Sequence, residues 1–423
     1  MNAALVFALV ALFVLSVPVA VSIGLASVFG IAFFSNLPLL VVPQKIFTSL
    51  DSFPLLAVPF FILAGNLMTH GGVSRRLVDF AKSLVGGMQG GLASSCVITC
   101  MIFAAISGSS VATTFAIGAI LIPAMVRHGY PTPVAATIQA ASAELGVIIP
   151  PSVPMIVYAV STETSVTQLF MAGIGPGILV ATMLIIMVQI WCRIKGYGKQ
   201  DGDQRLSVVI STRNAIWALM LPVIILGGIY GGIFTPTEAA AVSVVYALLI
   251  GMFVYRELKP ADLPAIFRSS VVSTGAIMLI IGAAGLFSFL VSLSGLPTTI
   301  GDWAQGRFDS AWQFLLFVNV LLLFVGMFVE TSAAILVLGP ILAPIAIGYG
   351  VDPVHFGIVI IVNLAMGMIT PPLGVNLFAA ASVAGIPVQR MFRALLVPVG
   401  TVVLALMLIT YVPQISLFLR DGW

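Results

Sequence analysis

The sequence predicts an all-α polytopic membrane protein, built as an inverted-topology repeat with two re-entrant helical hairpins and two broken helices. Three observations predict this class: 60% of the 423 residues are hydrophobic and only 7% charged, the apolar stretches have the length of helical spans, and the only two Pro-Pro pairs recur at a fixed spacing. Roughly a quarter of the residues of a soluble protein are charged, which excludes that class. The net charge of +3 provides no concentrated basic surface, so nucleic acid is excluded as a partner.

The chain begins with a long apolar run from Ala3 to Phe34. This run is too long for the hydrophobic region of a signal peptide and has no basic segment before it, so we expect it to be embedded in the membrane. It fits either one long tilted helix or two short helices that meet near Pro18 to Gly24.

Ten further apolar stretches of spanning length follow, separated by short polar loops. They lie at 53–68, 92–125, 134–160, 171–192, 214–233, 236–254, 270–294, 311–348, 355–380 and 394–419. None shows the alternation of barrel strands, and a backbone in lipid must satisfy its hydrogen bonds internally, so we expect helices.

Two of these stretches, 92–125 and 311–348, are too long for a single span, and each has a polar cluster at its middle. The clusters are Ser107-Gly108-Ser109-Ser110 and Glu330-Thr331-Ser332. Two short helices that enter the membrane and return to the same face, with the cluster at the tip, explain both the length and the polarity. We therefore predict hairpin tips at 107–110 and 329–332.

The distribution of basic residues supports this topology. With both stretches as hairpins and the basic loop 193–213 in the cytoplasm, fourteen of the 17 Lys and Arg residues fall on the cytoplasmic side, in the loops 70–90, 126–133, 193–213, 255–269 and 381–393. Only Lys45, Arg307 and Arg420 fall outside. Treating either long stretch as a single span breaks this agreement.

The two halves of the chain align at a constant offset of 221 residues. At this offset the matches are Gly118 with Gly339, Pro123 with Pro344, Gly129 with Gly350, Gly146 with Gly367, and Pro150-Pro151 with Pro371-Pro372. In the predicted topology the first hairpin enters from the cytoplasm and the second from outside, which is the inverted repeat of many secondary transporters. Because proline removes a helical hydrogen bond, each Pro-Pro pair predicts a broken helix with free carbonyl groups for a cation such as sodium (Na+).

Four motifs carry a resemblance to a known family. They are Ser107 to Ser110 followed by Ala112 and Thr113, Gly146 to Pro154 (GVIIPPSVP), Thr235 to Ala240 (TPTEAA), and Gly367 to Phe378 (GMITPPLGVNLF). Together they resemble the large membrane subunit, the DctM type, of tripartite ATP-independent periplasmic (TRAP) transporters, along essentially the whole chain. Glu330 stands where the family more often has Asp, and Glu144 occupies a position that is usually small or polar.

The resemblance implies an elevator-type transporter for Na+-coupled uptake of a small organic acid, a C4-dicarboxylate or a related carboxylate. It also implies a periplasmic solute-binding protein and a small four-helix membrane subunit as partners, in the bacterial inner (cytoplasmic) membrane. The expected organisation is 1–70 as N-terminal scaffold helices, 71–192 as the first repeat, 193–269 as a cytoplasmic loop and scaffold helices, and 270–423 as the second repeat.

No Lys or Arg falls at membrane depth, so the charge of an anionic substrate must be met by other groups. We expect backbone N–H groups at the tips, bound Na+ and polar side chains to do this. The candidate substrate-binding residues are Ser107, Ser109, Ser110, Thr113 and Asn376. The candidate Na+ ligands are Gly108, Pro150, Glu330, Thr331, Ser332, Thr370, Pro371 and Gly374.

The acidic residues at membrane depth have alternative interpretations. Glu330 fits either a cation site or a hydrogen-bonded acid that holds the tip, whereas Glu238 fits the first turn of a helix. The role of Glu144 stays open. A carboxylate in the bilayer is costly and usually has a functional partner.

Two other functions are less consistent with the sequence. A stand-alone sodium–dicarboxylate symporter would use the same hairpins without a binding protein. An intramembrane serine protease would need a base near a membrane serine, and His70, His128 and His355 all fall in loops or at helix ends, so we do not expect an enzyme.

Overall fold

The computed structural model describes residues 2–199 and 207–422, and within these ranges the protein is helical without a strand. Eight of the described helices are long and apolar enough to cross a membrane, or nine if the bent pair Thr132–Ile148 and Val153–Thr162 counts as one span. The expectation of an all-α polytopic membrane protein is confirmed. Arg205, one of the cations counted for loop 193–213, lies outside the described residues.

The N-terminal apolar run forms two helices, α1 (Asn2–Val14) and α2 (Val19–Phe34). The break falls just before the expected place, because Pro18 precedes α2 and a proline disfavours helical conformation in the residue before it. The chain continues through α3 (Val41–Leu50), the 3-10 turn η1 (Phe53–Leu56) and α4 (Ala57–His70).

The first repeat contains two helices joined by a tight turn, a broken helix and a long final helix. Its elements are α5 (Val73–Val85), α6 (Gly91–Ser107), α7 (Ser110–Arg127), α8 (Thr132–Ala143), α9 (Leu145–Ile148), α10 (Val153–Thr162) and α11 (Val166–Lys195). The segment 70–90, expected as a loop, holds the amphipathic helix α5, whose apolar face, including Leu77 and Val78, is buried.

The middle of the chain forms α12 (Val208–Tyr230), α13 (Pro236–Leu249), the π-helical turn η3 (Ile250–Val254) and the 3-10 turn η4 (Pro260–Asp262). Glu238 closes a capping box at the start of α13. Its carboxylate accepts from the backbone N–H of Thr235 at 2.8 Å, and its own N–H donates to the Thr235 hydroxyl at 3.3 Å. The structural interpretation of Glu238 is therefore correct.

The second repeat repeats the pattern of the first. Its elements are α14 (Leu263–Leu293), α15 (Leu296–Gln305), α16 (Ala311–Gly326), α17 (Thr331–Gly348), α18 (Pro353–Gly367), α19 (Val375–Ala384), the 3-10 turn η5 (Val388–Met391), α20 (Phe392–Tyr411) and α21 (Gln414–Asp421). The bounds of α7 and α17 lie 221 residues apart at both ends. Both Pro-Pro pairs are cis and lie in the breaks after α9 and α18.

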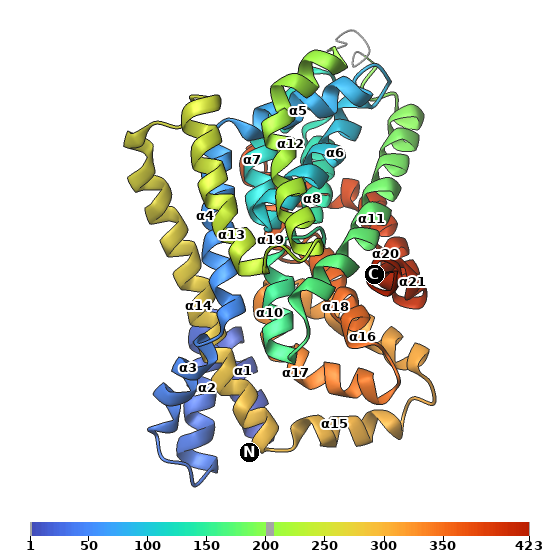
Figure 1. Cartoon of the computed structure of the whole chain (residues 1–423). Helices are drawn as coiled ribbons and strands as arrows, with labels where there is room; N and C mark the ends of the chain where they lie inside the picture. Colours follow the sequence, from blue (N-terminus) through green and yellow to red (C-terminus); the bar gives the residue numbers. More distant parts are fainter. Residues whose placement is uncertain (1, 200–206, 423) are drawn as a thin grey trace.

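The helices α4, α13 and α14 stand along one side of the molecule, with α1 to α3 at one end (Figure 1). Helix α15 runs along the edge of the view and connects α14 to α16. The other helices of the two repeats fill the remainder of the view, and both tips line one cavity together with α4 and α14. The membrane re-entry of the hairpins and the four-part division at 1–70, 71–192, 193–269 and 270–423 stay predictions.

Candidate functional site

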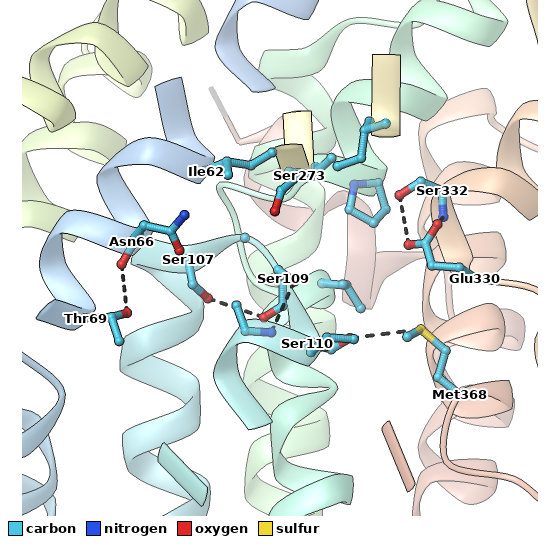
Figure 2. A pocket seen from close by; sticks show the side chains of 18 residues that line it. Ile62, Asn66, Thr69, Ser107, Ser109, Ser110, Ser273, Glu330, Ser332 and Met368 are labelled. Atoms are coloured by element: carbon cyan, nitrogen blue, oxygen red, sulfur yellow. Dashed lines mark hydrogen bonds between the residues drawn. The ribbon is translucent and has the colours of Figure 1, made fainter. Parts of the chain in front are cut away.

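A central cavity of about 160 Å³ lies where the two tips face α4 and α14 (Figure 2). Its lining comes from elements far apart in the chain. The lining residues are Ile62, Gly65, Asn66 and Thr69 of α4, Ser273 and Ile277 of α14, residues 107–112, Val147, Val153 and Pro154 of the first repeat, and Glu330, Ser332 and Met368 of the second.

The first tip is shaped by Gly108, which adopts a left-handed conformation with φ of +61° between α6 and α7. A Cβ at this position would lie 2.9 Å from the carbonyl oxygen of Pro151, so only glycine fits the close approach of the tip to the first broken helix. The same approach places the N–H of Val153 3.3 Å from the carbonyl oxygen of Gly108. The tip and the break therefore form one unit.

Hydroxyl groups organise this tip. Ser109 caps α7, with its hydroxyl accepting from the N–H of Ala112 at 3.4 Å. Thr113 donates to the carbonyl oxygen of Ser109 at 2.7 Å and lies 3.0 Å from the hydroxyl of Ser107. Thr113 is thus buried behind the tip, whereas Ser107 and Ser109 line the cavity.

The second tip uses a carboxylate where the first uses a hydroxyl. Glu330 caps α17, and its carboxylate accepts from the N–H groups of Ser332 at 2.9 Å and Ala333 at 3.2 Å. The Ser332 hydroxyl donates to the same carboxylate at 3.1 Å. These hydrogen bonds agree with an acid that holds the tip, and because Glu330 also lines the cavity, its role in a cation site stays a prediction.

The second broken helix contacts its hairpin as the first one does. The N–H of Gly374 donates to the carbonyl oxygen of Met327 at 3.1 Å. Gly374 lies 221 residues after Val153, whose N–H makes the corresponding bond in the first repeat. The two donors are equivalent at the repeat offset, whereas the acceptors differ, because Met327 corresponds to Ile106 rather than to Gly108. Each break is therefore bonded to the hairpin of its own repeat, with a different acceptor in the two cases.

The two tips meet at Met368. The hydroxyl of Thr331 donates to the sulfur of Met368 at 3.0 Å. The hydroxyl of Ser110 lies 4.0 Å from the same sulfur, as Figure 2 shows. Met368 lines the cavity and is otherwise buried. Sequence reasoning missed this residue, although it lies inside the GMITPPLGVNLF motif and at the repeat offset from Val147, which also lines the cavity.

The predicted residues divide into two groups. Six of them line the cavity: Ser107, Gly108, Ser109, Ser110, Glu330 and Ser332. The other seven do not line it: Thr113, Pro150, Thr331, Thr370, Pro371, Gly374 and Asn376. The structure thus brings the two tips to one cavity, which neither Pro-Pro pair lines.

Asn376 makes its contacts inside the protein. Its side-chain N–H donates to the carboxylate of Glu144 at 2.5 Å, and its carbonyl oxygen accepts from the hydroxyl of Thr114 at 3.4 Å. Asn376 and Glu144 are both fully buried, and the second oxygen of the Glu144 carboxylate has no protein partner in the described part of the chain. Asn376 therefore joins the second break to the first repeat and holds Glu144.

Polar residues of α4 and α14 form the opposite wall, and sequence reasoning did not select them. Asn66 donates to the hydroxyl of Ser270 at 2.8 Å, which ties α4 to α14 beside the cavity. A Cβ on Gly65 would lie 3.2 Å from Cα of Ser107, so this glycine lets α4 approach the first tip closely. An asparagine inside the apolar stretch 53–68 was the available signal.

The electrostatic character of the cavity follows from its lining. Among its described residues there is one carboxylate, from Glu330, and no Lys, Arg or His. No group of three His, Cys, Asp or Glu side chains suited to a metal occurs in ranges 2–199 and 207–422. Hydroxyls, amides, backbone groups and the helix N-termini at Ser110 and Thr331 must therefore bind any charged solute.

Comparison with known proteins agrees with this architecture. The structure resembles the crystal structure of the Alcanivorax borkumensis YdaH transporter with a TM-score of 0.63, over 90% of this chain and 88% of that one. At 14% sequence identity this likeness concerns the fold alone.

Two relatives are much closer in sequence. The chain is 45% identical to the C4-dicarboxylate TRAP transporter large permease protein DctM of Pseudomonas aeruginosa, over 95% of this chain and 94% of that protein. It is 44% identical to the isethionate TRAP transporter permease protein DctMQ of Oleidesulfovibrio alaskensis, over 96% of this chain and 64% of that protein.

These relatives are transporter permeases rather than enzymes. The family model described as tripartite ATP-independent periplasmic transporter, DctM component, matches residues 6–415. The chain therefore belongs to the DctM family, the large permease subunits of TRAP transporters.

Proposed function

We propose that this permease takes up a small organic acid anion, a C4-dicarboxylate or a related acid, in symport with Na+. The observation that carries this proposal is the convergence of the two tips on one cavity that has hydroxyl and backbone groups but no cationic side chain. An organic anion in such a cavity needs a positive partner, and a co-transported cation supplies it.

The Na+ ions are cargo in this proposal. Backbone carbonyls at the tips and at the breaks are oxygen ligands of the kind that transporters use for Na+. Gly108 and Ser109 at the first tip and Glu330 at the second place such oxygens on or beside the cavity wall. The carboxylate of Glu330 adds negative charge near the substrate, which increases the need for a cation.

The substrate class is supported by the relatives and by the cavity. The two relatives have nearly equal identity to this chain, yet one is named for a C4-dicarboxylate and the other for isethionate. Both names denote small organic anions. A cavity lined by serine hydroxyls suits an anionic oxygen group without discriminating sharply between carboxylate and sulfonate.

We propose three further features on the basis of the family. The partners are a periplasmic solute-binding protein and a small four-helix membrane subunit. The location is the bacterial inner membrane. The motion is an elevator movement of the two hairpins against α4 and α14, which face them across the cavity.

Transport in reconstituted vesicles tests the proposal. The permease is reconstituted with its small subunit, and uptake of labelled succinate, malate and isethionate is measured with and without the binding protein. We expect uptake only with an inward Na+ gradient and with the binding protein. Equal uptake when K+ replaces Na+ would contradict the coupling, and uptake without the binding protein would favour the stand-alone sodium–dicarboxylate symporter.

A further inference from the structure

A second cavity, of about 660 Å³, lies at the end of the molecule that carries most of the basic loops. It is formed by α5, the beginning of α12 and the segment after η3. In Figure 1, α5 and the beginning of α12 lie together at the top of the view. By the distribution of Lys and Arg this end is the cytoplasmic one. Nothing in the transport proposal uses this cavity.

The inner wall of the cavity is held by an internal ion pair. Arg76 bonds to the carboxylate of Glu257 at 2.5 Å, and its guanidinium carbon lies 3.8 Å from the centre of the Tyr255 ring. The Tyr255 hydroxyl accepts from the N–H of Ala218 at 3.1 Å and donates to the carbonyl oxygen of Asn214 at 3.2 Å. The charge of Arg76 is thus matched, and the wall ties α5 to α12.

Two further arginines on the rim have no such partner within residues 2–199 and 207–422. Arg75 and Arg213 are exposed, line the cavity and form no ion pair with any carboxylate of the described residues. Among the described lining residues Asp79 is the one other acidic side chain, so these residues together carry one net positive charge. Two exposed guanidinium groups at one opening suit an anion with several oxygens, and above all a phosphate.

Apolar surface continues directly from this rim. Ile210, Trp217 and Val254 line the cavity and are 62%, 47% and 43% exposed. Val209 and Phe253 extend this surface along α12 and η3. Trp217 lies one turn after Arg213 in α12, and a tryptophan near basic residues of a spanning helix is typical of the boundary between lipid and water.

We propose that this cavity binds the phosphate headgroup of an anionic membrane phospholipid, whose acyl chains lie on the apolar surface of α12 and η3. The cations alone would suit a free phosphate, and the apolar surface alone would suit any lipid. Only an anionic amphiphile uses both, because its headgroup and its chains meet at the same boundary. Basic pockets on the cytoplasmic side of membrane proteins bind such lipids by the same chemistry.

Native mass spectrometry of the full-length protein in detergent tests the proposal. Phosphatidylglycerol and phosphatidylcholine with identical acyl chains are titrated separately, so that only the headgroup charge differs. We expect the wild type to bind phosphatidylglycerol more tightly. In the double variant R75Q/R213Q we expect this affinity to fall by roughly 25-fold, about fivefold for each cation near the membrane surface.

The matched control is R390Q/R393Q, which removes two exposed cations from another loop of the same predicted side. We expect it to keep the wild-type affinity, and R75K/R213K to lose only part of it. Equal binding of both lipids by the wild type would overturn the proposal, as would an equal loss in the control. Displacement of the lipid by excess glycerol 3-phosphate would show a free-phosphate site instead.

Discussion

Ser110 and Thr331 lie 221 positions apart in the chain, and both direct their hydroxyl groups at the sulfur of Met368. They are the first residues of α7 and α17, the equivalent helices of the two repeats. The side chain of Met368 therefore contacts both tips at the wall of the central cavity. A thioether is a weak, polarisable acceptor, so this contact holds the tips together while remaining easy to break.

Replacing Met368 with leucine tests this contact. Leucine keeps the volume but removes the acceptor, so we expect a folded protein with a clear loss of uptake and a destabilisation of about 1 kcal/mol from the unsatisfied Thr331 hydroxyl. Uptake in vesicles and thermal unfolding measure the two effects. Met366→Leu is the control, because Met366 is equally buried but does not line the cavity. Equal transport by the two variants would rule out a role for the sulfur.

Ser109→Ala removes both a cavity hydroxyl and the cap of α7. We expect it to abolish Na+-dependent uptake, together with a loss of about 1 kcal/mol of stability from the missing cap. Ser165→Ala removes a cap of the same geometry from α11, where the hydroxyl accepts from Gln168 N–H at 3.4 Å, away from the cavity. The two variants should lose similar stability, and only the first should lose transport. Wild-type uptake by Ser109→Ala would count heavily against the proposed site.

Asn376→Ala leaves the buried carboxylate of Glu144 without its amide donor. We expect uptake to be abolished and stability to fall by roughly 1–3 kcal/mol, because a buried polar group loses its partner. The double variant N376A/E144A should recover part of that stability, since both partners are then removed. Thermal unfolding of the two single variants and the double variant gives the coupling free energy between the two side chains. Strictly additive losses would show that the two side chains act independently.

The ion pair between Asp352 and Arg420, at 2.5 Å, gives a pH dependence outside the membrane spans. Burial raises the pKa of Asp352, but the hydrogen bonds from Arg420 and from the N–H groups of His355 and Val354 outweigh burial and hold the pKa below its usual value. The stabilisation is therefore complete above the unfolded pKa of about 3.9 and is lost as the pH falls through the folded pKa.

Asp352→Asn isolates this ion pair, because asparagine still caps α18. We expect the variant to unfold more easily than the wild type by about 0.5–1 kcal/mol at pH 7, and the difference to vanish in acid. Thermal unfolding of both proteins between pH 7 and pH 3 measures this difference in stability. Arg420→Gln should reproduce the effect at neutral pH. A difference that grows as the pH falls would contradict the assignment.

Much of the fold could be predicted from the sequence because membrane helices obey local rules. An apolar run of spanning length must form a helix, and a proline pair must interrupt it, so the spans and the breaks near Pro150 and Pro371 follow from composition and spacing. The polar cluster at 107–110 was predicted as a tip for the same reason, and the cavity is lined by it. Helix α5 was not predicted, because its apolar residues are few and the same short segment contains three basic residues.

The partners of the tips could not be predicted in this way. Met368 lies 258 residues from Ser110, Asn66 meets Ser270 across 204 residues, and Asn376 reaches Glu144 across 232. In a chain that is apolar on nearly every helix face, hydrophobic patterning does not show which faces meet. Local chemistry thus dictated where helices form, bend and turn in this protein. The pairing of distant side chains arose from helix packing, because close contact between small residues such as Gly65 and the Ser107 backbone selects one arrangement of neighbours.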